Sequence, residues 1–133
     1  MRALIAEIEA TVAELGRAAG DDMVVIRDGL QEGAKALADA TQWVLTSHDA
    51  DAVMAVSVDY MMLTGYVCGG WQMARAALAA QRKLSAGEDP VFHEAKLVTA
   101  RFYAEHILPK AGALLRSVRS GGASILALSE EQF

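Results

Sequence analysis

Apolar residues recur at every third or fourth position between residues 53 and 78, and only a long helix places such a run on one face. The residues that keep this spacing are Val53, Val56, Tyr60, Leu63, Val67, Trp71, Ala74 and Leu78. A second stripe follows through Ser57, Met61, Gly65, Gly69 and Met73. Extended to the flanking breaks, the pattern predicts a helix over residues 50–85. A helix that is apolar on two sides contacts several neighbours or also forms an interface.

Two more helices are predicted before the long one. The first covers residues 3–18, where one face carries Leu4, Ile8, Val12 and Leu15. We expect Gly20 to end it, because glycine adopts the left-handed conformation of a helix C-terminus without strain. The second covers residues 23–46, and Asp21 or Asp22 is its expected N-terminal cap.

Local signals mark the starts of the third and fourth helices. The break at residues 47–49 precedes the long third helix, and Asp49 or Asp51 is expected to cap it. Asp89 followed by Pro90 is a strong start signal, because aspartate caps well and proline suits the first helical position.

The fourth helix is predicted over residues 91–119. Pro109 lies inside it and removes one backbone hydrogen bond, so we expect a kink near Glu105. Gly121 and Gly122 are expected to stop the helix. The apolar tail that follows is predicted to form one short helical turn and to pack against another surface.

The composition agrees with a fold built only from helices. About one residue in five is alanine, the best helix former, and there are only two prolines. A chain of 133 residues with 53% hydrophobic residues is expected to form one domain over residues 1–133 without a disulfide or metal. Gly29 and Gly33 lie on one face of the second helix, where a neighbour can approach closely. We therefore predict an all-α fold, an antiparallel four-helix bundle with a long third helix.

The charge distribution argues against a nucleic-acid-binding protein. The net charge is −5, whereas non-specific binding to phosphates needs a basic surface. Residues up to Asp59 include 11 acidic and 4 basic side chains, and residues from Tyr60 onward include 6 acidic and 8 basic ones. Such a dipolar surface suits docking to another protein, or it is simply solvated.

The sequence is typical of a soluble, cytoplasmic protein. Cys68 is the only cysteine, which fits a reducing compartment. The N-terminus mixes charged and apolar residues and lacks the apolar core of a signal peptide. The longest uncharged run, residues 60–74, is shorter than the ~20 residues of a membrane-spanning helix.

The sequence predicts no catalytic, cofactor-binding or metal-binding residue. A di-iron site in a helical bundle needs two Glu-x-x-His motifs, and none occurs. Zinc needs three or four converging ligands, but His48, His93, His106 and Cys68 are scattered over three elements. Cys68 lies in an apolar stretch, so we expect a buried and unreactive thiol.

Two polar groupings each have a functional and a structural interpretation. Arg75, Arg82 and Lys83 can hold an anion such as phosphate, or they balance the dipole at the end of the long helix. Tyr103 and His106 are three residues apart, so they can form a polar pair or a structural contact near the predicted kink.

Three segments carry a resemblance to a known family. Residues 60–78, residues 96–110 and the ending at 127–133 are similar to the extra C-terminal helical domain of large bacterial acyl-CoA dehydrogenases of the 3-methylmercaptopropionyl-CoA dehydrogenase type. The Gly-Gly-Trp and Phe-Tyr-Ala-Glu strings are the most specific parts. The resemblance is close from about residue 57 to residue 133 and loose before it.

The resemblance implies a parent enzyme with three further domains. Those domains would bind FAD and the acyl-CoA and supply a catalytic glutamate, whose matching segment lies upstream of this chain. No cofactor is implied for this chain itself. The resemblance also implies a homodimer or larger assembly, with this bundle on the outside or at a subunit contact.

Two functions follow as alternatives. The first is a non-catalytic accessory and assembly domain of an FAD-dependent acyl-CoA dehydrogenase. The second is a free-standing helical bundle that self-associates or binds a protein partner. For either function the candidate packing or interface residues are Tyr60, Gly65, Gly69, Gly70, Trp71, Phe102, Tyr103 and Phe133.

Overall fold

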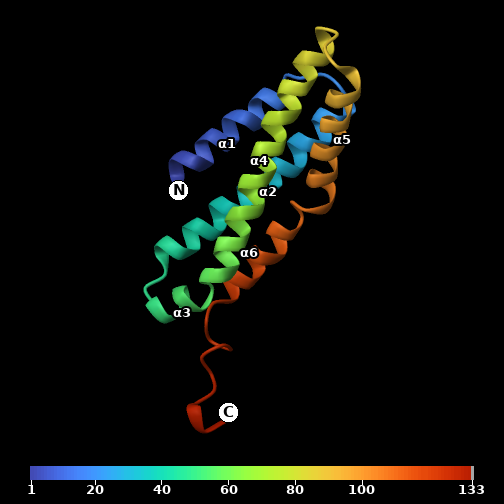
Figure 1. Cartoon of the computed structure of the whole chain (residues 1–133). Coiled ribbons are helices and arrows are strands. Elements are labelled where there is room, and N and C mark those ends of the chain that lie inside the picture. The colour runs from blue at the N-terminus through green and yellow to red at the C-terminus, as the bar shows by residue number, and fades with distance from the viewer. Residues whose placement is uncertain (133) are drawn as a thin grey trace.

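A computed structural model describes residues 1–132, and every regular element in this range is helical. In chain order the elements are α1 (Arg2–Leu15), α2 (Asp21–Thr46), α3 (Ala50–Ala55), α4 (Ser57–Ser85), α5 (Pro90–His106), α6 (Lys110–Ser120) and the 3-10 turn η1 (Glu130–Gln132) (Figure 1). The predicted all-α fold is confirmed. In this part of the chain no helix combines the length and the apolar character needed to cross a membrane.

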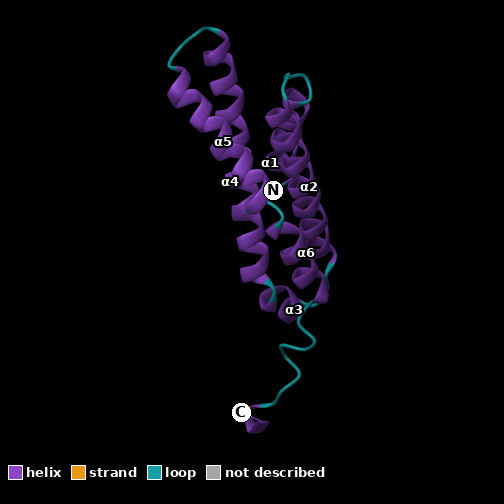
Figure 2. Ribbon diagram, turned by 90° about the vertical axis from the view of Figure 1, so that its right-hand side faces the viewer, coloured by secondary structure: helices purple, strands orange, loops and turns teal. Residues whose placement is uncertain are grey.

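Helix α4 is the longest helix and the centre of the packing. It lies against α2, α5 and α6, while α1 packs mainly on α2 and less extensively on α4. Figure 2 shows these helices running roughly along one axis, with the short α3 at the lower end. The arrangement is compatible with the predicted four-helix bundle if α3 with α4, and α5 with α6, each replace one predicted helix.

One hydrophobic cluster joins buried residues from all the longer helices. Its largest fully buried side chains are Ile8, Leu15, Met23, Ile26, Leu30, Leu37, Leu63, Val56, Val67 and Val118. Complete burial of one aliphatic side chain of this size stabilises a fold by about 1.5–3 kcal/mol. Many of these residues belong to the stripes predicted from the sequence, so the spacing located the helical segments but not the breaks within them.

The prediction of one continuous helix over residues 50–85 is wrong, because the chain breaks at Val56. This residue ends α3 and precedes α4 with φ −100° and ψ 6°, which are not α-helical values. Its side chain is buried in the core. Val53, Val56 and Tyr60 keep helical spacing across the break, so the periodicity gave no sign of it.

The predicted fourth helix is also two helices, separated by residues 107–109. Pro109 has no N–H to donate to the carbonyl of Glu105. The amide of Leu108 instead donates to the carbonyl of Tyr103 at 3.0 Å. The expected kink near Glu105 is therefore wrong, because the disturbance is larger: the helix ends and a new one begins.

The expected roles of Gly20 and its two aspartates are wrong. Helix α1 already ends at Leu15, and Gly20, with φ 109°, stands immediately before α2. Such a positive φ favours glycine. Asp21 and Asp22 occupy the first turn of α2 without capping it by a side-chain hydrogen bond. Their carboxylates still interact favourably with the positive end of the helix dipole.

The predicted start of α5 at Asp89 and Pro90 is confirmed. A carboxylate oxygen of Asp89 accepts a hydrogen bond from the amide of Phe92 at 3.3 Å, and Pro90 is the first helical residue. We expect Asp89→Ala to lower the free energy of unfolding, measured in urea, by about 1 kcal/mol because one helix amide loses its acceptor. Asp89→Asn keeps an acceptor and tolerates the observed φ of 33°, so it should behave as wild type. An equal loss in both variants would contradict the capping role.

Two other predicted boundaries are confirmed. The carboxylate of Asp49 accepts from the amide of Ala52 at 3.0 Å, and Gly121, with φ 67°, follows the end of α6. The predicted short turn of the tail is η1. In the described part of the tail, Ile125, Leu126 and Leu128 are each more than half exposed. Packing of the tail against another surface stays a prediction.

Candidate interaction surfaces

The paired glycines of α4 lie where α5 gives way to α6. A Cβ atom on Gly70 would lie 2.7 to 2.9 Å from three side-chain atoms of Leu108. A Cβ atom on Gly69 would lie 2.9 Å from Cζ of Tyr103. Real Cβ atoms do not approach other atoms so closely, so Leu108 and Tyr103 occupy space that any larger residue would fill. The structure places both glycines inside the packing of the bundle.

The close approach predicted at Gly29 and Gly33 of α2 is confirmed. A Cβ atom on Gly29 would lie 3.1 Å from the carbonyl oxygen of Ala104, and one on Gly33 would lie 3.1 Å from Cδ2 of Leu108. Leu108 therefore lies between Gly33 of α2 and Gly70 of α4. The helix break at residues 107–109 directs this leucine into the space between the two glycines.

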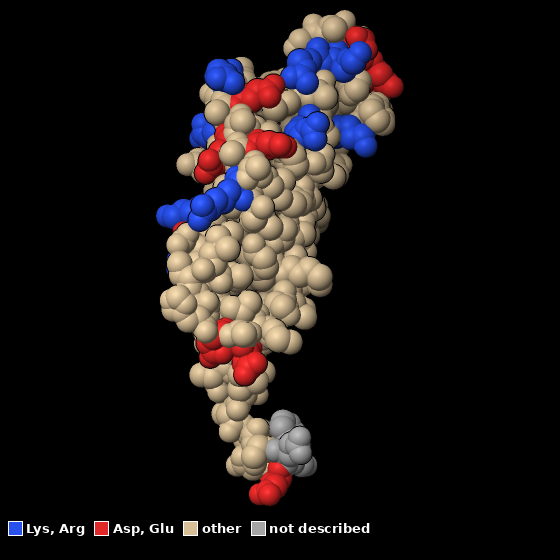
Figure 3. All heavy atoms as spheres, turned by 90° about the vertical axis from the view of Figure 1, so that its left-hand side faces the viewer, with Lys and Arg blue, Asp and Glu red and all other residues tan. Residues whose placement is uncertain are grey.

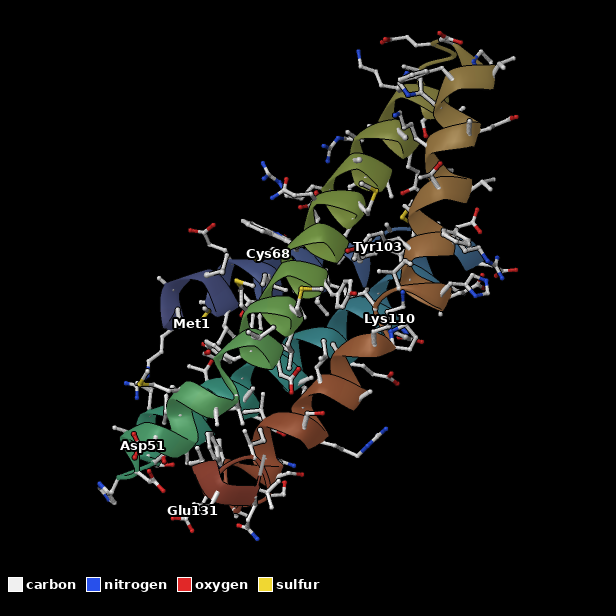
Figure 4. The ribbon with its side chains drawn as sticks, turned by 60° about the horizontal axis from the view of Figure 1, so that its bottom comes forward. Met1, Asp51, Cys68, Tyr103, Lys110 and Glu131 are labelled. Carbon is white, nitrogen blue, oxygen red and sulfur yellow. The ribbon has the colours of Figure 1, made fainter. Side chains whose placement is uncertain are left out.

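Tyr103 connects α5 to the middle of α4. Its hydroxyl donates to the carbonyl of Tyr66 at 3.1 Å, and its burial raises the pKa of that hydroxyl above its ordinary value. The ammonium of Lys110 lies 5.5 Å from the centre of the Tyr66 ring, so α6 contributes to the same group. Figure 4 shows Tyr103 and Lys110 on either side of the break between α5 and α6.

His106 is not the partner of Tyr103, although their spacing allowed it. Its ring instead lies 4.9 Å from that of Phe102 on the exposed side of α5.

Tyr60 and Trp71 tie α4 to its neighbours by hydrogen bonds. The hydroxyls of Tyr60 and Thr41, a buried residue of α2, lie 2.9 Å apart. The indole N–H of Trp71 donates to the hydroxyl of Thr11 in α1 at 2.8 Å. Both aromatic residues are partly buried against the core cluster. The structure therefore places them at contacts between helices.

The basic residues near the end of α4 have partners within the chain. Arg82 forms an ion pair with Glu14 of α1 at 3.1 Å, and Lys83 forms one with Glu88 at 2.7 Å. The guanidinium of Arg75 lies 5.2 Å from the centre of the Trp71 ring. These contacts favour the structural interpretation of the basic cluster over an anion-binding site.

Cys68 is partly buried, so the expectation of a fully buried thiol is wrong. The remaining burial raises the pKa of the Cys68 thiol, which lowers the fraction of reactive thiolate. Across residues 1–132, His, Cys, Asp and Glu side chains form no group of three or more that could hold a metal ion.

The outward face of α5 carries a line of large apolar side chains. Val91 is 82% exposed, Val98 67% and Phe102 54%. Together with Ala95 they recur every three or four residues, which places them on one side of the helix. We call these four residues the α5 stripe. Single exposed apolar residues are common, but a line of this length is typical of a surface that another protein or domain covers.

Two candidate residues remain, Gly65 and Phe133. Gly65 is exposed, and nothing lies within 4 Å of the position that its Cβ atom would take. Phe133 lies outside the described residues. The sequence grouped these residues with Gly69, Gly70 and Trp71, whereas the structure separates outward residues, Gly65 and Phe102 among them, from internal ones.

Residues 4–129 match a protein family described as "Acetyl-CoA dehydrogenase C-terminal like". The chain belongs to this family. Its sequence is 34% identical to 3-methylmercaptopropionyl-CoA dehydrogenase of Ruegeria pomeroyi over 124 residues, which cover 92% of this chain and 21% of that protein. It is 31% identical to butyryl-CoA dehydrogenase of Syntrophomonas wolfei over 70 residues, which cover 50% of this chain and 12% of that protein.

The match confirms the resemblance and extends it. The family pattern begins at residue 4, so it includes the first two helices, where the resemblance predicted from the sequence was loose. The chain spans about a fifth or less of the length of these two relatives.

Proposed function

We propose that this chain is a non-catalytic accessory and assembly domain of a larger, cytoplasmic, FAD-dependent acyl-CoA dehydrogenase. The family match over residues 4–129, together with the small share of each relative that the chain covers, carries this proposal. The flavin, the acyl-CoA and the catalytic base would belong to other domains of the parent enzyme. The role of this bundle would be to cover apolar surface and support assembly.

The α5 stripe supports the accessory role. Val91, Val98 and Phe102 expose apolar side chains along one side of α5. Contact with another domain would remove this surface from water at a gain of about 25 cal/mol per Å². We assign the α5 stripe to contact with the parent's other domains.

The free-standing bundle remains the second candidate function. It is supported by a second outward apolar surface, on the first half of α4, where Val58 and Met61 are each 62% exposed. In a free-standing protein this surface would serve self-association or a protein partner.

The mass of the native polypeptide distinguishes the two functions. An antibody to this chain would capture the polypeptide from its source, and mass spectrometry would give its intact mass. An accessory domain is expected on a polypeptide several times heavier than 14.1 kDa, on a yellow protein that releases flavin when denatured. A colourless polypeptide of about 14.1 kDa would overturn the proposal and favour the free-standing bundle.

A further inference from the structure

Helix α4 presents a regular seam on the side opposite the core. Val58, Met61, Gly65, Cys68 and Gln72 recur at alternating steps of three and four residues, and we call them the α4 seam. Buried residues of the same helix, such as Leu63 and Val67, lie on its other side. Alternation of three and four residues is the pattern by which two helices pack along their whole length. The seam has this pattern, but the described residues of the chain place no helix against it.

The α4 seam contains no charge and has an open position at its centre. Val58 and Met61 are each 62% exposed, and the space around Gly65 is free within 4 Å. A glycine in the middle of an exposed helix face allows the backbone of a second helix to approach closely. Figure 3 shows a broad uncharged surface across the middle of the molecule.

The two ends of this surface differ in charge. Asp49 and Asp51 lie at the α3 end, where Figure 3 shows only acidic side chains. Toward the other end, Arg75 is exposed on α4, and Arg82 beyond it already pairs with Glu14 of α1. A partner that matches the surface therefore has an uncharged centre, basic residues opposite the aspartates and acidic residues opposite Arg75.

A second copy of this chain, turned end over end, has that distribution of charge. We propose that two copies pair through antiparallel α4 seams, with Gly65 of each copy at the two-fold axis. The acidic α3 end of each copy then lies beside Arg75 of the other, so the favourable contact forms twice. A parallel pair would bring like charges together. This pairing rests on the assembly role proposed above and leaves the α5 stripe free for other domains.

Cysteine cross-linking tests the position of the two-fold axis. In a Cys68→Ser background, Gly65→Cys places one thiol in each copy at the axis, within the distance of about 7 Å between Cα atoms that a disulfide requires. We expect mild oxidation to double the mass on a non-reducing gel, and reductant to reverse it. Val98→Cys in the same background is the matched control, since it puts an exposed cysteine on α5. It should stay monomeric under the same conditions.

The result at Gly65 decides the pairing. Absence of cross-linking by Gly65→Cys, or equal cross-linking by Val98→Cys, would overturn it. Circular dichroism establishes that the variants are folded, and the open space at Gly65 favours this.

Charge reversal tests the antiparallel orientation independently. Asp51→Arg makes both end contacts repulsive in a pair of identical chains, and so does Arg75→Glu. We expect each variant alone to dimerise at least tenfold more weakly in sedimentation experiments. A mixture of the two variants restores both contacts, so it should dimerise as well as wild type. A mixture no better than either variant alone would contradict the antiparallel arrangement.

These experiments separate the pairing from the proposed function. A heavy, yellow native polypeptide without cross-linking at Gly65 would leave the accessory domain in place and overturn the pairing. Cross-linking at Gly65 in a native polypeptide of about 14.1 kDa would support the pairing and overturn the accessory domain.

Discussion

Replacing Gly70 with alanine is expected to lower the free energy of unfolding by about 1–3 kcal/mol, which is typical when a packed core is overfilled. The added Cβ atom would lie 2.7 Å from Cδ2, 2.8 Å from Cδ1 and 2.9 Å from Cγ of Leu108. Leu108 cannot move away easily, because it is buried and also approaches Gly33 on the opposite helix. Urea unfolding followed by circular dichroism would measure the loss.

Gly65→Ala is the matched control, because it makes the same change in the same helix. No atom lies within 4 Å of the new Cβ atom, and alanine is favoured over glycine inside a helix by about 1 kcal/mol. We therefore expect a gain in stability, measured in dilute solution where copies do not pair. The two variants should differ in sign. A gain, or no change, in Gly70→Ala would show that Leu108 repacks without cost.

The sequence predicted the helices well because burial and periodicity coincide. Ile8, Leu63 and Val67 were placed on apolar stripes, and all three are buried. Asp89 and Pro90 also predicted a helix start correctly, since the cap and the fixed φ angle of proline need no distant contact. Signals of this kind are complete within a few residues of chain.

The breaks were not predictable because their causes are distant in sequence. Val56 continues the apolar spacing, and the change of direction there depends on the core that buries it. Pro109 did indicate a disturbance of the helix, but the extent of that disturbance depends on where Leu108 packs. That position is provided by Gly33 and Gly70, on two other helices.

Among its candidate residues, the sequence could not tell the packing residues from the outward ones. Gly65 and Gly69 belong to one stripe in the sequence, four residues apart. In the structure Gly69 faces Tyr103, while nothing lies near Gly65. When a helix is apolar on two sides, its sequence does not indicate which side packs against the rest of the chain. Only the placement of α1 and α5 resolves this.

Loss of the Trp71 side chain is expected to detach α1 from α4. Trp71 is partly buried against the core, and its indole N–H donates to Thr11. Truncation to alanine removes both the packing and the hydrogen bond, so Trp71→Ala should lower the free energy of unfolding by about 2–4 kcal/mol. Amide hydrogen exchange would show faster exchange in α1 than in α6, because α1 is the helix that loses its contact.

Trp71→Phe separates the two contributions. Phenylalanine keeps most of the packing but cannot donate to Thr11, so the loss should be about 1 kcal/mol. Arg82→Ala removes the exposed ion pair with Glu14, a second polar contact between α1 and α4, and should cost less than about 1 kcal/mol. Equal losses in Trp71→Ala and Arg82→Ala would contradict the anchoring role. The predicted order of losses would show that Trp71 contributes more than the exposed ion pair to the contact of α1 with α4.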